Sequence, residues 1–239
     1  LFLSLTLSVS LRQGRHIQIA VIAAFLIRVS LLVLLILRAW YSGHSAHYLR
    51  AGDATKYHEW ACYVVETADW RLWGALPTYT YIVASLYRMF GPDPNIIDLV
   101  NMCLGLMLVP LVSELGRRCG GRRAGIASAW LVALYPSLIL WSISGVKDVW
   151  LVLGTVLTAY MTTSLASGQC RISDTVKFSI GAPLLVYLRF QFLLSLLLAV
   201  GATMFVRGSR SRRPRPVLIL VFAVLGSLTL LSPLGRSAL

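Results

Sequence analysis

Two short segments combine residue types that could move a proton. Asp53, Tyr57 and Ala61 recur every four residues in GDATKYHEWA, so a helix would place them on one face. A carboxylate there could accept a proton from a substrate hydroxyl. Lys147 and Asp148 are adjacent in YPSLILWSISGVKDVW. A lysine at a membrane surface is usually an anchor that extends to water, but here an acid follows it directly.

The composition indicates a membrane protein. Of 239 residues, 57% are hydrophobic and 13% are charged, whereas an average soluble domain has about 25% charged residues. The mean hydropathy is +0.75. These values exclude an ordinary soluble enzyme and a disordered chain. The net charge of +13 arises mainly from 19 arginines. We interpret these arginines as belonging to loops on the inner side of the plasma membrane, and we expect no nucleic-acid partner.

The apolar runs predict an all-α, polytopic bundle of about seven passes within one domain over 1–239. Two arginine-rich loops, 117–123 and 207–215, are expected on the inner side, together with the N-terminus. Since the sequence begins at Leu1 and lacks a basic leader, we interpret it as a fragment of a longer protein. The predicted single spans are 17–39, 96–116, 124–143, 149–167 and 217–234.

Parity of crossings then assigns the remaining segments. Only one crossing fits between residue 40 and the loop at 117, so the run 77–90 is predicted to lie along the outer interface. Residues 40–95 form one large outer loop with interfacial helices. The stretch 178–206 must cross out and return, and we place its break near Arg189, helped by Pro183.

Four ordered segments resemble the N-terminal membrane core of the GT-C glycosyltransferases. The similarity is greatest to the family 39, dolichyl-phosphate-mannose protein mannosyltransferase-like enzymes and their bacterial relatives, including the aminoarabinose transferases of lipid A. It covers residues 20–206. In aminoarabinose transferases a Lys-Pro-Pro precedes the interfacial helix, where this chain has Ala75-Leu76-Pro77. The matching segments are Asp53 to Ala61, Leu76 to Gly91 with its Met-Phe-Gly ending, Arg117 to Ala124, and Ala133 to Asp148.

The resemblance implies transfer of a sugar from a polyprenyl-phosphate carrier to a glycan, lipid or protein acceptor on the outer face. Asp53 matches the catalytic acid of the family and would act as general base in an inverting reaction. By position, Lys147 and Arg189 are the candidates to stabilise the departing phosphate. Tyr57 and Asp148 complete the predicted substrate-binding residues. The partners expected are the carrier-linked sugar, its acceptor and membrane lipids, with no cofactor.

Other interpretations stay open. The carboxylates, Asp53 included, could simply occupy the one sizeable aqueous loop of a non-enzymatic scaffold, or of a transporter or flippase-type envelope protein. Arg28, inside the first span, could extend to water, pair with an acid or mark a shifted helix boundary. The four cysteines show no zinc spacing. Three outer-loop histidines, His44, His47 and His58, are interpreted as interfacial residues, so no metal site is predicted.

Overall fold

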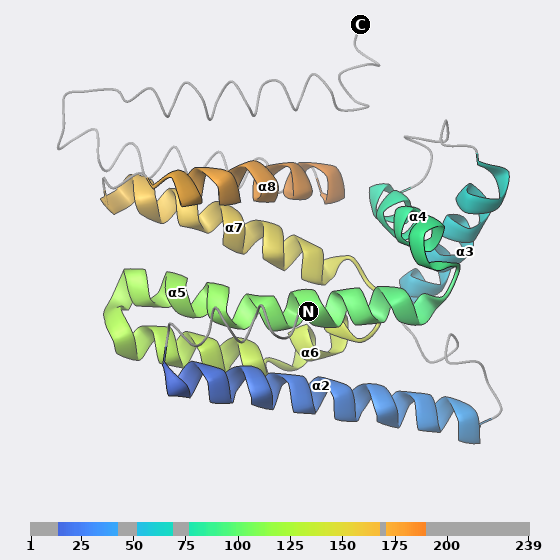
Figure 1. Cartoon of the computed structure of the whole chain (residues 1–239), viewed down its shortest axis with the longest axis horizontal. Helices are drawn as coiled ribbons and strands as arrows, with labels where there is room; N and C mark the ends of the chain where they lie inside the picture. The colour runs from blue at the N-terminus through green and yellow to red at the C-terminus, as the bar shows by residue number, and fades with distance from the viewer. Residues whose placement is uncertain (1–13, 43–51, 69–76, 168–170, 190–239) are drawn as a thin grey trace, which may run out of the picture. The chain divides into compact units, whose positions relative to one another are not determined.

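The structure, a computed structural model, describes residues 14–42, 52–68, 77–167 and 171–189. Within these ranges the chain folds into seven helices and no strand, which confirms the all-α class for the described part (Figure 1). The chain divides into two compact units, one ending at Trp150 and the other beginning at Leu151. The helices are α2 (Arg15–Tyr41), α3 (Gly52–Thr67), α4 (Thr78–Phe90), α5 (Pro94–Leu134), α6 (Pro136–Ser142), α7 (Asp148–Ser167) and α8 (Ile172–Leu188).

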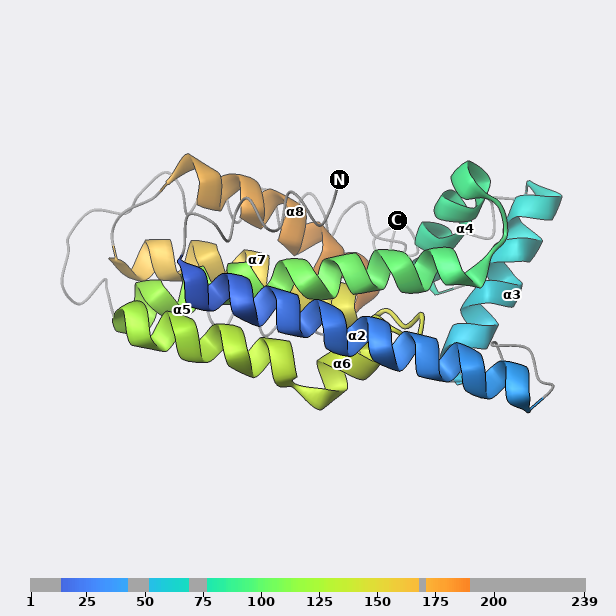
Figure 2. The same cartoon turned by 60° about the horizontal axis from the view of Figure 1, so that its bottom comes forward.

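Helix α2 packs along α5 in the first unit (Figure 2). Much of the outer surface of α2 is apolar and exposed. Leu26, Leu34 and Leu37 are 54–59% exposed, which suits a helix that meets lipid on one side. The buried side is narrow and rich in small residues, which lets the helix backbones approach closely. The core cluster contains Ile17, Ala20, Val21 and Ala24 of α2 and Met102, Leu106, Val109, Ala129 and Ala133 of α5.

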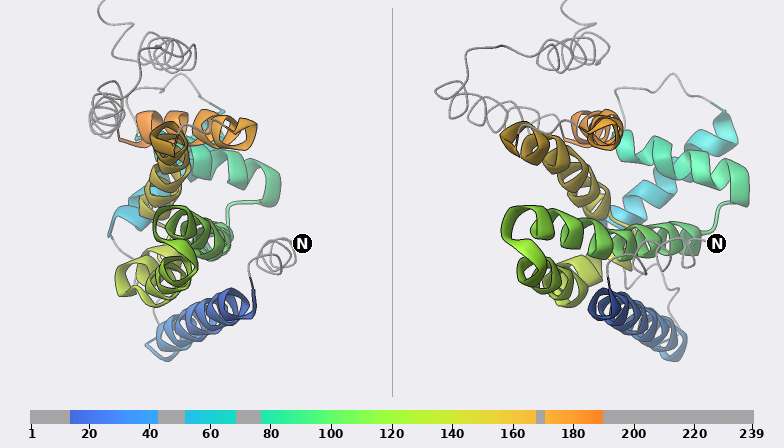
Figure 3. Two further views of the ribbon diagram at one scale, coloured as in Figure 1. Left: turned by 90° about the vertical axis from the view of Figure 1, so that its left-hand side faces the viewer. Right: turned by 60° about the vertical axis from the view of Figure 1, so that its left-hand side comes forward.

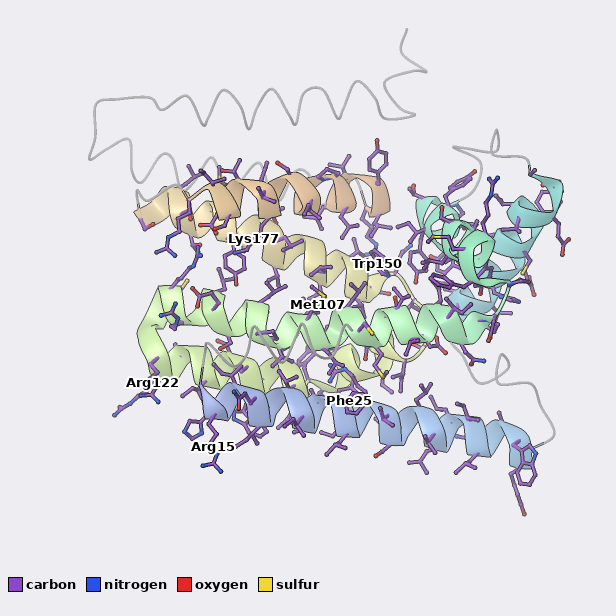
Figure 4. All side chains as sticks on the ribbon, viewed as in Figure 1. Arg15, Phe25, Met107, Arg122, Trp150 and Lys177 are labelled. Atoms are coloured by element: carbon purple, nitrogen blue, oxygen red, sulfur yellow. The ribbon has the colours of Figure 1, made fainter. Side chains whose placement is uncertain are left out.

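Helix α5 is a hairpin of two antiparallel arms that turns at Gly121 (Figure 3). Gly121 has φ 76°, a conformation that other residues rarely adopt, so glycine allows the turn. The arms touch where Gly125 faces the carbonyl of Ser113, and a Cβ at Gly125 would lie 2.9 Å from that oxygen. The turn carries four arginines, as expected for the loop 117–123, and one of them, Arg122, is marked in Figure 4.

Three of the described helices are long and apolar enough to cross a membrane: Arg15–Tyr41, Pro94–Leu134 and the Asp148–Leu165 part of α7. They agree with the spans expected at 17–39, 96–116 and 149–167. The span expected at 124–143 differs, because the helix ends at Leu134 and α6 begins at Pro136. Proline disfavours helical backbone in the residue before it, and Tyr135 is extended with ψ 113°. The expected segments 190–206 and 217–234 lie outside the described residues.

Helices α3 and α4 pack on each other near the beginning of α5 (Figure 1). At 13 residues, α4 is about 20 Å long, too short for a hydrocarbon core of about 30 Å. Its buried face includes Tyr79, Tyr81 and Tyr87. A short helix over the predicted segment 77–90 is therefore present, and its interfacial position stays a prediction.

The second unit contains a helical hairpin of α7 and α8. As expected, α8 ends at Leu188 and Arg189 is extended, with φ −154° and an exposed side chain. The helix begins at Ile172, earlier than the expected 178, and Asp174 lies fully buried in its first turn. Asp174 accepts hydrogen bonds from Ser164 and from Lys177, whose Nζ lies 3.4 Å away.

The predicted topology is testable through the native Cys119, which is exposed beside the α5 turn. With the other cysteines replaced by serine, an impermeant maleimide should label Cys119 only in inside-out vesicles. A cysteine-free chain carrying Ser85→Cys on α4 should be labelled only in right-side-out vesicles, since 77–90 does not cross. Labelling of both positions from one side would contradict the proposed topology.

Candidate functional site

Helix α3 presents the predicted catalytic Asp53 in its first turn, at the edge of a buried face. That face consists of Ala54, Tyr57, Ala61 and Val64. Tyr57 and Ala61 are thus buried on one side as the four-residue spacing predicts, whereas the side chain of Asp53 is exposed. An anion in this turn interacts favourably with the positive end of the helix dipole. Asp53 is accessible from solvent, one helical turn from Tyr57.

The ring of Tyr57 brings α3 into contact with two other segments. It packs edge-on against Tyr79 of α4, with ring centroids 4.9 Å apart. The Nζ atom of Lys147 lies 5.6 Å from the Tyr57 ring centroid, within the range of a cation–π interaction. The structure therefore brings together two predicted substrate-binding residues, Tyr57 and Lys147, that are far apart in the sequence.

The loop that carries Lys147 is fixed by hydrogen bonds to its backbone carbonyls. Tyr79 Oη donates to the carbonyl oxygens of Gly145 and Val146, at 3.3 and 3.4 Å. Asn101 Nδ2 donates to the Val146 oxygen at 2.9 Å. Trp150, marked in Figure 4, donates from Nε1 to Asn101 Oδ1 at 2.8 Å. Lys147 thus follows a loop with little freedom, which favours a defined position for its ammonium group.

Sequence reasoning missed Tyr79, Asn101 and Trp150, because nothing in their spacing connects them. Tyr79 is 1% exposed and Asn101 is fully buried. Burial raises the pKa of the Tyr79 phenol well above its usual value, and the charge of Asp98 acts in the same direction, while the hydrogen bond with Asn101 opposes it. The phenol therefore stays protonated and remains a donor to the loop. The one sequence signal for this group of residues is Asn101, a polar side chain within an apolar helix.

Arg28 of α2 binds the other end of the segment that leads to Lys147, where α5 ends and α6 follows. It is fully buried, although it lies inside a candidate span. Its Nε donates to Ser142 Oγ at 3.0 Å, and its Nη1 donates to the carbonyls of Ala24 and Ala133. None of the three open interpretations of Arg28 therefore holds. The absence of a side chain at Gly105 leaves space for the Arg28 guanidinium group, because a Cβ at this position would lie 3.3 Å from Arg28 Nε.

The remaining predicted residues are placed less closely. Asp148 begins α7 and is half-buried, next to Lys147 in the chain. Arg189 belongs to the second unit, so its place beside Lys147 remains a prediction. His44 and His47 lie outside the described residues, and His58 shares a 2.7 Å hydrogen bond with Tyr87 Oη. No group of three or more potential metal ligands occurs in the part of the chain that the structure describes.

A small hollow borders this region, between α3, α4, the start of α5 and the loop before Lys147. It has room for about one water-sized group. Its polar lining consists of Tyr57, His58, Tyr87 and Asp98, and Asp98 is only 1% exposed. Burial distinguishes Asp98 from the exposed Asp53.

The described structure defines an all-helical protein with three helices able to span a membrane. Comparison with protein-family models, with curated proteins and with solved structures gives no match. The residues gathered around Tyr57 and Lys147 are therefore the features of the described chain that bear on its function.

The raised pKa of Tyr79 predicts how stability depends on pH. Tyr79→Phe should lower the free energy of unfolding by about 1 kcal/mol at neutral pH, because donors to the loop carbonyls are lost. Since the folded-state pKa lies above the ordinary value of about 10, the contribution of the phenol is complete below about pH 10 and declines as the pH rises further. Thermal unfolding of both proteins in detergent between pH 7 and 11 measures this pH dependence.

The matched control is Tyr63→Phe, since Tyr63 is 51% exposed on α3. Its stability should follow the wild type at each pH. A constant difference between Tyr79→Phe and the wild type from pH 7 to 11 would contradict the role assigned to the buried phenol.

Proposed function

We propose that the protein is a membrane glycosyltransferase that transfers a sugar from a polyprenyl-phosphate carrier to an acceptor on the outer face of the plasma membrane. The observation that carries the proposal is the approach of Lys147 to Tyr57, one helical turn from Asp53. The same chain contains three helices long enough to span a membrane. The resemblance to GT-C enzymes supplies the reaction class.

In the proposed reaction the acceptor hydroxyl attacks the anomeric carbon of the sugar, and its proton passes to the Asp53 carboxylate. A bond forms between the acceptor oxygen and the anomeric carbon while the bond from that carbon to the phosphate oxygen breaks. The carrier phosphate leaves with the electron pair. A single displacement of this kind inverts the anomeric centre. The exposure of Asp53 gives an acceptor access to it.

Lys147 would stabilise the negative charge that develops on the departing phosphate. The Tyr57 ring and the fixed loop restrict the position of its ammonium group. Asp148, the next residue, would help orient the lysine or the sugar. Arg189 is proposed as a second cation for the phosphate. A polyprenyl tail would stay in the hydrocarbon while the sugar phosphate reaches the polar edge of the bundle.

One observation favours a second candidate, a non-enzymatic scaffold or a transporter or flippase-type envelope protein. Asp53 is exposed in the described structure, as a carboxylate without a chemical role at an aqueous surface would be. Such a protein would have Lys147 as a surface anchor. The two candidates differ in whether removal of the Asp53 charge affects sugar transfer.

Substitution of the two proposed groups provides the test. In liposomes supplied with polyprenyl-phosphate sugars and candidate acceptors, Asp53→Asn should lower the transfer rate by about 10²–10⁴-fold, because it removes the proton acceptor and keeps the shape. Lys147→Ala should lower it by about 10²–10³-fold, the usual effect of losing one electrostatic donor. Product formation from a radiolabelled sugar measures both.

The matched controls are Glu59→Gln for Asp53→Asn and Lys56→Ala for Lys147→Ala. Each removes a charge of the same sign from an exposed position of α3. Both should transfer sugar at nearly the wild-type rate. Near-normal transfer by Asp53→Asn would exclude Asp53 as the base. Absence of transfer and of carrier binding in the wild type would favour the second candidate.

A further inference from the structure

The hollow beside Tyr57 has the chemical lining of a binding site for a hydroxyl group. Its walls come from three helices and one loop of the first unit, and its interior admits about one water-sized group. A sugar ring is too large to enter. A single hydroxyl substituent fits, with the remainder of the ring outside the opening.

Asp98 provides the acceptor. It lies in the second turn of α5, is 1% exposed and lines the hollow. A carboxyl oxygen accepts hydrogen bonds from hydroxyl groups, so a hydroxyl inside the hollow would find an acceptor in Asp98.

Two other lining residues, His58 and Tyr87, provide groups that complement the hydroxyl oxygen. His58 and Tyr87 share a hydrogen bond of 2.7 Å, and their rings meet edge-on with centroids 5.4 Å apart. This pair borders the same hollow as Asp98. A hydroxyl group both donates and accepts hydrogen bonds, so a lining that contains a carboxyl group and an imidazole–phenol pair matches it.

Gly145 joins the hollow to the proposed phosphate-binding lysine. It has φ 69°, and a Cβ there would lie 3.2 Å from Asp98 Oδ1 and 3.1 Å from Ile97. The backbone of the Lys147 loop therefore closes directly over the carboxylate, two residues before the lysine. A sugar whose phosphate lies at Lys147 would have its ring next to the opening.

We propose that this hollow binds one hydroxyl group of the carrier-linked sugar, with Asp98 as the hydrogen-bond acceptor and the His58–Tyr87 pair as the second polar contact. The inference rests on the proposed function and deepens it, because it assigns the recognition of the sugar to residues other than Asp53 and Lys147. Asp98 then distinguishes a carrier that bears a sugar from one that bears only phosphate.

The test compares carriers with and without a sugar by binding to the full chain in nanodiscs. The probes are polyprenyl phosphate and polyprenyl-phosphate mannose, glucose and aminoarabinose. The sugar-bearing carrier that binds most tightly should bind the wild type at least tenfold more tightly than polyprenyl phosphate does. Asp98→Asn should remove this preference. It should weaken the binding of that sugar-bearing carrier by about 10–100-fold and leave the affinity for polyprenyl phosphate unchanged.

The matched control is Asp93→Asn, which removes a carboxylate from the exposed start of the same helix. Asparagine also caps helices, so folding is preserved, and the sugar preference should remain. Tyr87→Phe keeps the ring and should reduce the preference about tenfold, which provides a second readout if Asp98→Asn fails to fold.

Each result separates the two proposals. A full sugar preference in Asp98→Asn or, if that variant fails to fold, in Tyr87→Phe would overturn the inference, because the hollow would then hold water only, and the proposed function would stand. The same conclusion follows if the wild type binds all the carriers equally. A wild type that binds no carrier and transfers no sugar would overturn the proposed function itself.

Discussion

The carbonyl groups of the Lys147 loop determine how the first unit is built. Between α6 and α7 the chain leaves helical conformation, and the oxygens of Gly145 and Val146 need donors because buried carbonyls without partners are costly. Tyr79 supplies one donor from α4 and Asn101 another from α5. This requirement fixes α4 against the start of α5, and α3 follows through the contact of Tyr57 with Tyr79.

The same principle operates at the preceding break in the helices. Tyr135 is extended, so the last carbonyls of α5 lose partners within their helix. Arg28 donates to the oxygen of Ala133 and also to Ser142 Oγ at the end of α6. A buried arginine in a spanning helix, costly by itself, thereby joins α2 to the segment that leads to Lys147. Both ends of this segment are held by side chains from distant helices.

Burial separates the carboxylates of the region into two kinds. Asp53 is exposed to solvent, whereas Asp98 is buried against Gly145. A group that must exchange a proton with a substrate benefits from access, and a group that only accepts a hydrogen bond benefits from exclusion of water. The hydroxyl group of Tyr87, bonded to His58, gives the hollow its second polar wall.

The sequence by itself determined the helical class, three of the apolar spans, the turn at 117–123 and the break at Arg189, because these depend on local hydropathy, proline and glycine. It also selected Tyr57 and Lys147 through local spacing. It did not predict Asn101, Tyr79, Trp150 or Asp98 as part of a site, since their roles arise from contacts between segments far apart in the chain. Only the tertiary structure decided that Asp98 is buried and Asp53 exposed, because burial depends on which helices pack above each residue.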